Sequence, residues 1–416
     1  MPKAGYCCVK PWSGQSWATR RGPTRPPPVH AAETRLDGQD LGWDNGRGLA
    51  DDVRIEVIRK RDLEHNVPRG FHDPHGIASV GEAKRQLLLD NPLSRSADDP
   101  VALVGLRGDT VIGKLVLLAG EVLVQGEPSP ASWTSDLYVH PEHRASLLGV
   151  SLVMKMARLA PLSLACGISQ AALPVFRNLK WVDLEMPRWI MLRRSGPLVR
   201  RYLGRGLGQE AAAKVADAAL AAYALVPRAA LALLGRGLAA RRVEAMPAEL
   251  DGRIAAPDAD VVCHRSSAWI AWLLAQARAV DPRKRSELHL VEHASGAVAG
   301  YVLTKARFHA TASAQGFEDL WLGSVSDWRV LRPDLVDDRA LVLFGIEALL
   351  RHPVDAIEIC TADASVGDVL RKLGCRRAGT LHLMFKAARG APLSDPAYRA
   401  ADRWRLRPVE GDIFFF

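Results

Sequence analysis

The chain repeats one local plan at nearly constant spacing, and this repeat constrains its fold more than any other feature. Residues 135–139 read SDLYV and residues 326–330 read SDWRV, an offset of 191 (326 − 135). Each segment is followed by a loop with a proline, an apolar helical stretch, an apolar strand and a short helix. The short helices end at Trp181 and Cys375, an offset of 194 (375 − 181). Agreement in order and spacing predicts a duplication of one supersecondary unit.

Apolar periodicity and turn residues place strands and helices in each copy. In the first copy we expect strands at 53–58, 101–106, 111–118, 133–139, 162–168 and 189–192, with helices at 82–89, 146–159 and 170–179. In the second copy we expect strands at 288–291, 298–304, 320–330, 356–360 and 381–385, with helices at 266–277, 339–350 and 366–373. The last strand of the first copy is expected to begin just after Pro187.

A length of 416 residues exceeds what one hydrophobic core usually organises. We therefore expect two domains, 52–194 and 250–388, joined by an Ala- and Leu-rich helical linker at 195–249. Residues 1–51 mix Arg, Pro and Gly without an apolar periodicity, so we expect a disordered tail that can be deleted without loss of stability. Residues 389–416 form a C-terminal extension. Its three final phenylalanines suggest docking into a groove of the protein or of a second subunit.

Residues 137–149, which read LYVHPEHRASLLG, resemble the cofactor motif of the GNAT superfamily of acyl-CoA N-acyltransferases. The resemblance implies an α/β (α+β) fold with two GNAT-like domains. Each would have a mixed, mostly antiparallel sheet, a central splayed strand and flanking helices. It also implies acetyl-CoA or another acyl-CoA as the donor. The cofactor-binding residues would be Leu137, Val139, Arg144, Ala145, Ser146, Leu147, Leu148 and Gly149.

The chemistry of this motif is that of a pyrophosphate site. Backbone N–H groups at a helix N-terminus point outward, and the helix dipole favours negative charge there. Arg144 and Gly149 match the family pattern, whereas its first glycine is replaced by Leu147. The family also places a tyrosine on the following short helix to protonate the departing thiolate. Phe176 stands at that position and carries no hydroxyl group.

The catalytic candidates lie on the strand that precedes the cofactor loop. The resemblance implies Asp136 as the base that takes the proton of the amine, with a structural role as the alternative. Tyr138 is an acid or a packing residue. No pair of histidines has the spacing of a metal site, so we expect no metal. In the second copy, residues 330–339 lack glycine and carry three aspartates where phosphates would sit, so we expect no coenzyme A there.

The net charge of +9 is dispersed along the chain, which argues against a nucleic-acid partner. The six cysteines form no C-x-x-C pair, and no export signal precedes them, which favours a reducing cytoplasm. Within 196–242 we expect helices at 210–225 and 228–238, joined at Pro227. Their uninterrupted apolar stretches fall short of the ~20 residues of a membrane span. Either they pack on a domain, or they rest weakly on an anionic membrane surface.

Two functions from different classes follow from these observations. The first is an N-acyltransferase, with acetyl-CoA as donor and a small-molecule or glycan amine as acceptor. The second is a non-catalytic or acyl-CoA-sensing protein that retains the fold, as Leu147 and Phe176 favour. A variant of the first would use aminoacyl-tRNA as donor. A homodimer is an additional expectation, because the aromatic C-terminus could dock on a second subunit.

Overall fold

The structure is a computed structural model that describes residues 52–63, 72–78, 80–196, 199, 207–256, 259–280, 284–309, 319–411 and 414. The expected N-terminal tail lies outside the described residues, and its dispensability stays a prediction. The strands of the first half are β1 (Val53–Arg59), β2 (Pro100–Arg107), β3 (Thr110–Val124), β4 (Glu127–Val139), β5 (Leu162–Cys166) and β6 (Val182–Leu192). Those of the second half are β7 (Leu238–Val243), β8 (Val261–Cys263), β9 (Arg285–His293), β10 (Val298–His309), β11 (Leu320–Val330), β12 (Ala356–Cys360) and β13 (Arg376–Ala387).

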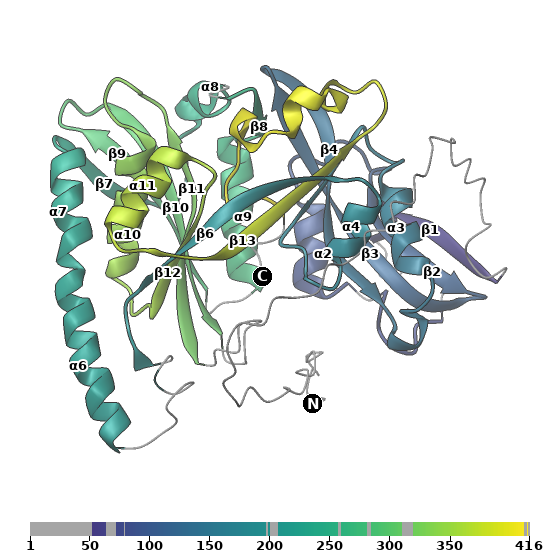
Figure 1. The fold of residues 1–416 in the computed structure, drawn as a ribbon. Coiled ribbons are helices and arrows are strands. Elements are labelled where there is room, and N and C mark those ends of the chain that lie inside the picture. Colours follow the sequence, from purple (N-terminus) through teal and green to yellow (C-terminus); the bar gives the residue numbers. More distant parts are fainter. Residues whose placement is uncertain are drawn as a thin grey trace, which may run out of the picture. The chain divides into compact units, whose positions relative to one another are not determined.

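One continuous sheet links the two halves, in the order β1-β2-β3-β4-β5-β13-β6-β12-β11-β10-β9-β7. The last strand of each half pairs with the last strand but one of the other, because β13 lies beside β5 and β6 lies beside β12. Figure 1 shows β6 and β13 side by side as they cross between the halves. The sheet therefore runs through the expected domain boundary at 194. The expected helical linker also contributes β7, which pairs with β9.

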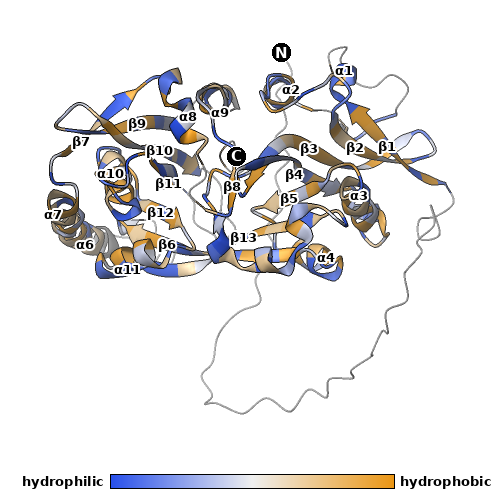
Figure 2. Ribbon diagram, turned by 90° about the horizontal axis from the view of Figure 1, so that it is seen from above, coloured by the Kyte–Doolittle hydropathy of each residue, from blue (hydrophilic) through white to orange (hydrophobic). Residues whose placement is uncertain are grey.

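The helices cover both faces of this sheet. They are α1 (Lys60–Leu63), α2 (Glu82–Leu89), α3 (Leu148–Met156), α4 (Leu173–Asn178), α6 (Leu207–Tyr223), α7 (Leu225–Leu234), α8 (Asp251–Ile254), α9 (Ser267–Val280), α10 (Asp338–Leu350) and α11 (Ala364–Lys372). Figure 2 shows α1, α2, α8 and α9 on one side, and α3, α4, α7, α10 and α11 on the other. Separate apolar clusters lie under α3 with α4 and under α10 with α11, as expected for a duplicated unit.

Two local expectations need correction. The strand expected to begin after Pro187 runs through it, from Val182 to Leu192. Pro187 lies opposite Thr380 where the register of β13 shifts, and such an irregularity tolerates a residue without an N–H group. The joint between the two linker helices is Ala224, and Pro227 lies within the first turn of α7. Proline is tolerated there because that N–H group has no partner within the helix.

The segment Ala211–Leu234, which spans α6 and α7, is long and apolar enough to cross a membrane, the one such segment among the described residues. Lys214, Asp217 and Arg228 interrupt it, so its uninterrupted apolar stretches are short, as expected. Leu238, expected to end the second helix, instead begins β7. At the C-terminus, Phe414 is fully buried in the core that contains Trp133 and Trp404, so this aromatic docks within the protein itself.

Candidate functional site

The first half contains a β-bulge in strand β4. Tyr138 lies opposite Lys114 of β3 and Ser135 lies opposite Val116, so β4 carries one extra residue between these pairs. Asp136 lies in this bulge with a φ of 49°, in the left-handed region. Aspartate tolerates that region better than most residues, and bulges of this kind redirect side chains next to functional sites. The bulge therefore turns the Asp136 side chain out of the regular alternation of the strand.

Beyond this point β4 separates from β5. The parallel ladder between them covers only Ala131–Trp133 paired with Leu162–Leu164, whereas β4 continues to Val139. On its other edge, β4 stays paired with β3 as far as Val139. The end of β4 thus turns one row of backbone groups toward the gap between the strands. An extended ligand arm could hydrogen-bond to these groups as an added strand does.

The loop after β4 leads into the N-terminus of α3. The N-cap of α3 is Leu147, which makes no side-chain hydrogen bond to the first turn. Ser146 Oγ donates to His143 O at 2.6 Å, and the N–H of Leu148 approaches the same hydroxyl at 3.3 Å. The first turn of a helix has N–H groups without intrahelical partners, so this end of α3 can accept an anion.

The residues expected to bind the cofactor follow one another along β4, this loop and α3. Leu137 and Val139 are half-buried, whereas Arg144, Ala145 and Ser146 are exposed. Arg144 Nε donates to the carbonyl of Val139 at 3.3 Å. The other three expected residues are Leu147, Leu148 and Gly149.

The side chain at 147 points outward, since Leu147 is 44% exposed, whereas Leu148 is fully buried. Leu148 packs where a Cβ on Gly105 or Gly113 would lie within 3 Å of its side chain. Close packing of α3 on the sheet therefore depends on these two glycines. Only the backbone of Leu148 can serve a ligand. A Cβ on Gly149 would meet protein atoms no closer than 3.6 Å, so the fold itself does not require glycine there.

Two lysines that sequence reasoning missed surround Asp136. Lys84 of α2 forms an ion pair with the Asp136 carboxylate. Burial lowers the pKa of Lys114; the Asp136 carboxylate opposes this shift, and the Lys84 ammonium adds to it. Because Tyr138 lies directly opposite Lys114, the two expected catalytic residues and two amines meet at one place. The three segments are distant in sequence, and no local signal marked the lysines.

The second half repeats this geometry. The β11–β12 ladder covers only Leu322–Ser324 paired with Ala356–Glu358, and β11 continues to Val330. The register of β11 also shifts by one residue, since Leu303 lies opposite Asp327 and Thr304 lies opposite Val325. A helix, α10, follows this strand as α3 follows β4. Both halves therefore repeat one arrangement, a strand that separates from its neighbour and a helix that follows it.

Solved structures that are similar to this chain share little sequence identity with it. A GCN5-related N-acetyltransferase from Anabaena variabilis is 11% identical with a TM-score of 0.49, and the match covers 80% of this chain and 72% of that one. Saccharomyces cerevisiae N-myristoyltransferase is 11% identical with a TM-score of 0.48, and the match covers 84% of this chain and 82% of that one. A tandem GNAT protein from the clavulanic acid biosynthesis pathway is 14% identical with a TM-score of 0.39, and the match covers 80% of this chain and 98% of that one. No protein-family model and no curated protein sequence matches the chain.

In the second half, the place that corresponds to the N-terminus of α3 is filled by the protein itself. Asp337 is the N-cap of α10, and its carboxylate accepts the N–H of Ala340 at 2.9 Å. Asp338 accepts hydrogen bonds from Arg407 at 2.9 Å and from Trp328 Nε1 at 2.8 Å. Arg407 also donates to the carbonyl of Trp328 at 3.3 Å. The C-terminal extension therefore contacts the separated end of β11 and the start of α10. That this half binds no coenzyme A stays a prediction.

Asp327, the counterpart of Asp136, is buried in a network of charged and polar groups. Arg265 donates to Asp327 at 3.1 Å and to Glu410 at 2.6 Å, and the Tyr301 hydroxyl donates to Asp327 at 2.8 Å. Such a buried cluster is stable only when every charge has a partner. The network ties the C-terminal extension to the second half, and Asp327 therefore has a structural role.

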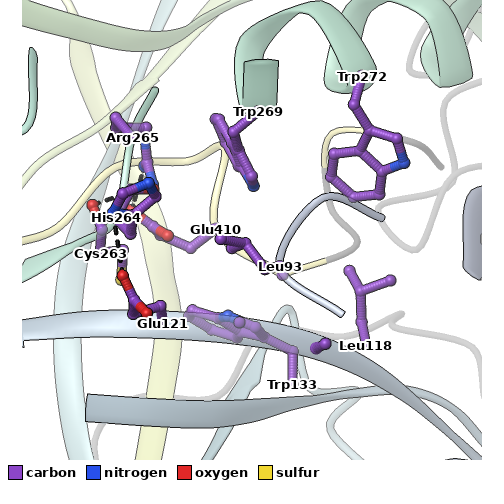
Figure 3. A pocket seen from close by; sticks show the side chains of 13 residues that line it. Leu93, Leu118, Glu121, Trp133, Cys263, His264, Arg265, Trp269, Trp272 and Glu410 are labelled. Atoms are coloured by element: carbon purple, nitrogen blue, oxygen red, sulfur yellow. Dashed lines mark hydrogen bonds and ion pairs between the residues drawn. The ribbon is translucent and has the colours of Figure 1, made fainter. Parts of the chain in front are cut away.

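A narrow pocket beside this network brings together residues from both halves (Figure 3). Trp133 lies on one side, Trp269 and Trp272 lie on the other, and Glu410 lies between them. The space open to a water-sized solute is about 20 Å³, which holds about one water molecule. The tryptophans of α9 are buried in the core, and the guanidinium of Arg265 lies 4.4 Å from the ring of Trp269. They stabilise the fold and form no open glycan groove here.

Two groups of side chains among the described residues have the composition of a metal site. They are His140, Glu142 and His143 in the loop, and Asp183, Glu185 and His382 on β6 and β13, each with donor atoms within 4.8 Å. In the second group, Asp183 already accepts a hydrogen bond from Arg177 at 2.8 Å and lies 3.0 Å from His382 Nδ1. The first group lies in a surface turn and offers three atoms that could bind a metal ion. That the site works without a metal stays a prediction.

Phe176, at the position of the family's tyrosine, belongs to the core. It is buried and meets Trp181 edge to face, with ring centroids 4.9 Å apart. Its counterpart Leu370 is also fully buried. Neither residue carries a group that can donate a proton.

Proposed function

We propose that the first GNAT-like half binds an acyl-CoA and transfers the acyl group to an amine. The observation that carries this proposal is the open N-terminus of α3 beside the splayed end of β4. The N-terminus offers N–H groups and a favourable dipole to a pyrophosphate. The splayed strand offers backbone groups to the pantetheine arm. Acetyl-CoA is the proposed donor, and a small-molecule or glycan amine is the proposed acceptor.

The proposed reaction forms a C–N bond and breaks the C–S bond of the thioester. The amine must lose a proton, and Asp136 is the proposed acceptor of that proton. Lys114 is a second group on the same face whose lowered pKa favours the neutral amine form. Tyr138 is the proposed proton donor to the thiolate. A thiolate with a pKa near 8.5 is a tolerable leaving group, so a weak acid suffices.

A second function has its own support. A fold that binds acyl-CoA without transferring the acyl group would explain Phe176 in place of a tyrosine and the ion pair that engages Asp136. For either function we propose a cytoplasmic protein that binds no nucleic acid. The four described cysteines are buried free thiols, which suits a reducing compartment.

Calorimetric titration of the full chain with acetyl-CoA tests the cofactor site. Arg144→Ala should weaken binding about ten- to a hundredfold, because charge-assisted hydrogen bonds contribute roughly 1.5–3 kcal/mol. Leu147→Gly should preserve or tighten binding, since it removes the side chain nearest the phosphates. Arg339→Ala is the matched control in the second half and should leave binding unchanged.

Absence of acetyl-CoA binding in both the parent protein and Leu147→Gly would contradict the cofactor assignment. The two functions are then separated by incubating the bound complex with a panel of amines and measuring free thiol. Release of coenzyme A supports transfer. Retention of acetyl-CoA with every amine supports the sensing function.

A further inference from the structure

The helices α6 and α7 present an exposed apolar face. They run end to end along one edge of the molecule in Figure 1, and 11% of the apolar window within Ala211–Leu234 is buried. Val215, Leu225 and Leu233 are 73%, 60% and 78% exposed. The positions that complete this face at steps of three or four residues are all exposed as well: Ala211, Ala218, Ala222, Ala229 and Ala232. A continuous apolar surface of this kind marks an interaction site.

The opposite face of the same helices is attached to the protein. Arg193 Nη1 donates to the carbonyl of Leu220 at 3.1 Å, and Ser195 Oγ donates to Asp217 at 2.7 Å. Arg228 pairs with Glu347 of α10 at 3.0 Å. The Tyr223 hydroxyl donates to the carbonyl of Leu373. These contacts orient the apolar face outward and oppose insertion of the segment across a bilayer.

Contrary to the expectation of a dispersed charge, the net positive charge of the chain is concentrated in residues 193–242. Residues 193–242 hold ten basic and two acidic residues, a net charge of +8 out of the +9 of the whole chain. The basic residues are Arg193, Arg194, Arg200, Arg201, Arg205, Lys214, Arg228, Arg236, Arg241 and Arg242. A second copy of the chain would bring the same positive charge to the interface and be repelled. An anionic surface would be attracted.

We propose that α6 and α7 lie in the plane of an anionic phospholipid surface, with the exposed apolar face among the acyl chains and the exposed side chains of Lys214, Arg228 and Arg236 at the level of the headgroups. An apolar face with cations at its borders has the composition of an interfacial helix. The attachment to α10 through Arg228 keeps the GNAT-like fold on the lipid surface as a peripheral body. This inference stands independently of the proposed acyl transfer.

Flotation with vesicles tests the proposal on the full chain. We expect the protein to float with vesicles of phosphatidylcholine and phosphatidylglycerol, and far less with phosphatidylcholine alone. The triple variant Val215→Ser, Leu225→Ser and Leu233→Ser should lower partitioning at least about tenfold, since three inserted side chains are lost. Arg236→Glu should lower it about fivefold or more, whereas Arg158→Glu, an equal charge change on exposed α3-flanking surface, should have little effect.

The variants alter exposed side chains, so thermal unfolding should match that of the parent protein and exclude misfolding as the cause. Equal flotation of the triple variant and the parent would overturn the proposal, as would no flotation of the parent with anionic vesicles. Light scattering gives the third outcome. A parent dimer that the triple variant converts to a monomer, without vesicle binding by either, would assign the face to a second copy and overturn the lipid assignment.

Discussion

The N-termini of α3 and α10 occupy corresponding places in the two halves but have opposite surroundings. At the α3 end the N-cap residue Leu147 makes no side-chain hydrogen bond, and the nearest acceptor is the neutral hydroxyl of Ser146. The α10 end carries its own anion, the Asp337 carboxylate, and the next residue holds Arg407 of the C-terminal extension. A bound anion can replace a cap that is missing, but it cannot share a site with a carboxylate. Duplication has thus left one half open to a ligand and the other closed by protein groups.

The short helices repeat this contrast. The N-cap of α4 is Ala172, which makes no side-chain hydrogen bond. The N-cap of α11 is Asp363, whose carboxylate accepts the N–H groups of Ser365 and Val366. Carboxylate caps stabilise a helix by about 1 kcal/mol. The second half therefore has a carboxylate cap at both of these helices, whereas the corresponding helices of the first half have none.

The largest expected loss of stability is in the second half, on removal of the Asp338 carboxylate that pairs with the C-terminal extension. Asp338→Ala removes a carboxylate that pairs with the buried Arg407 and with Arg405, and we expect a loss of about 3 kcal/mol or more in the free energy of unfolding. Denaturant unfolding measures this change. Asp334→Ala, which removes an exposed pair with Arg332, should cost less than about 1 kcal/mol. Equal effects of the two variants would show that Asp338 does not hold the extension in place.

The difference between the two helix ends can be tested by giving α3 a carboxylate N-cap like that of α10. Leu147→Asp places a carboxylate at the N-cap of α3, where it should stabilise the helix and compete with the pyrophosphate. We expect at least about tenfold weaker binding of acetyl-CoA by calorimetry. Leu147→Asn supplies a neutral cap as the control and should weaken binding less. Unchanged affinity in Leu147→Asp would place the anion elsewhere.

The smallest expected effect comes from the cap of α11 and depends on pH. Burial raises the pKa of Asp363, but hydrogen bonds from Ser365 and Val366 outweigh burial and lower it below its ordinary value of 3.8. A lowered pKa in the folded state means that the stabilisation is present above the unfolded pKa and is lost as pH falls through the folded one.

Asp363→Ala should therefore cost about 1 kcal/mol at neutral pH, with a difference from the parent that narrows as pH falls below about 4. Unfolding measured from pH 7 downward tests this. The matched change in the first half, Ala172→Ser, introduces a cap where none exists and should not add this pH dependence. A difference for Asp363→Ala that stays constant with pH would contradict the assignment.

The sequence by itself determined the duplication, most of the elements and the position of the loop. The helix at Glu82–Leu89 and the strands at Leu320–Val330 and Ala356–Cys360 were predicted with their bounds. Such features depend on periodicity, caps and turn residues, which are local information. For the same reason, the cofactor loop could be located from residues 137–149 alone. The roles of its residues stay predictions.

Only the tertiary structure decided which strands became neighbours and which side chains met. The exchange of β6 and β13 depends on hydrogen-bonding edges that either half could offer, and no local pattern distinguishes them. Lys84 and Lys114 reach Asp136 from separate elements, and Arg407 reaches Asp338 from 69 residues away. The open face of α6 and α7 was also decided by packing. An apolar periodicity predicts that a face will be covered, but only the folded chain shows that this one is not.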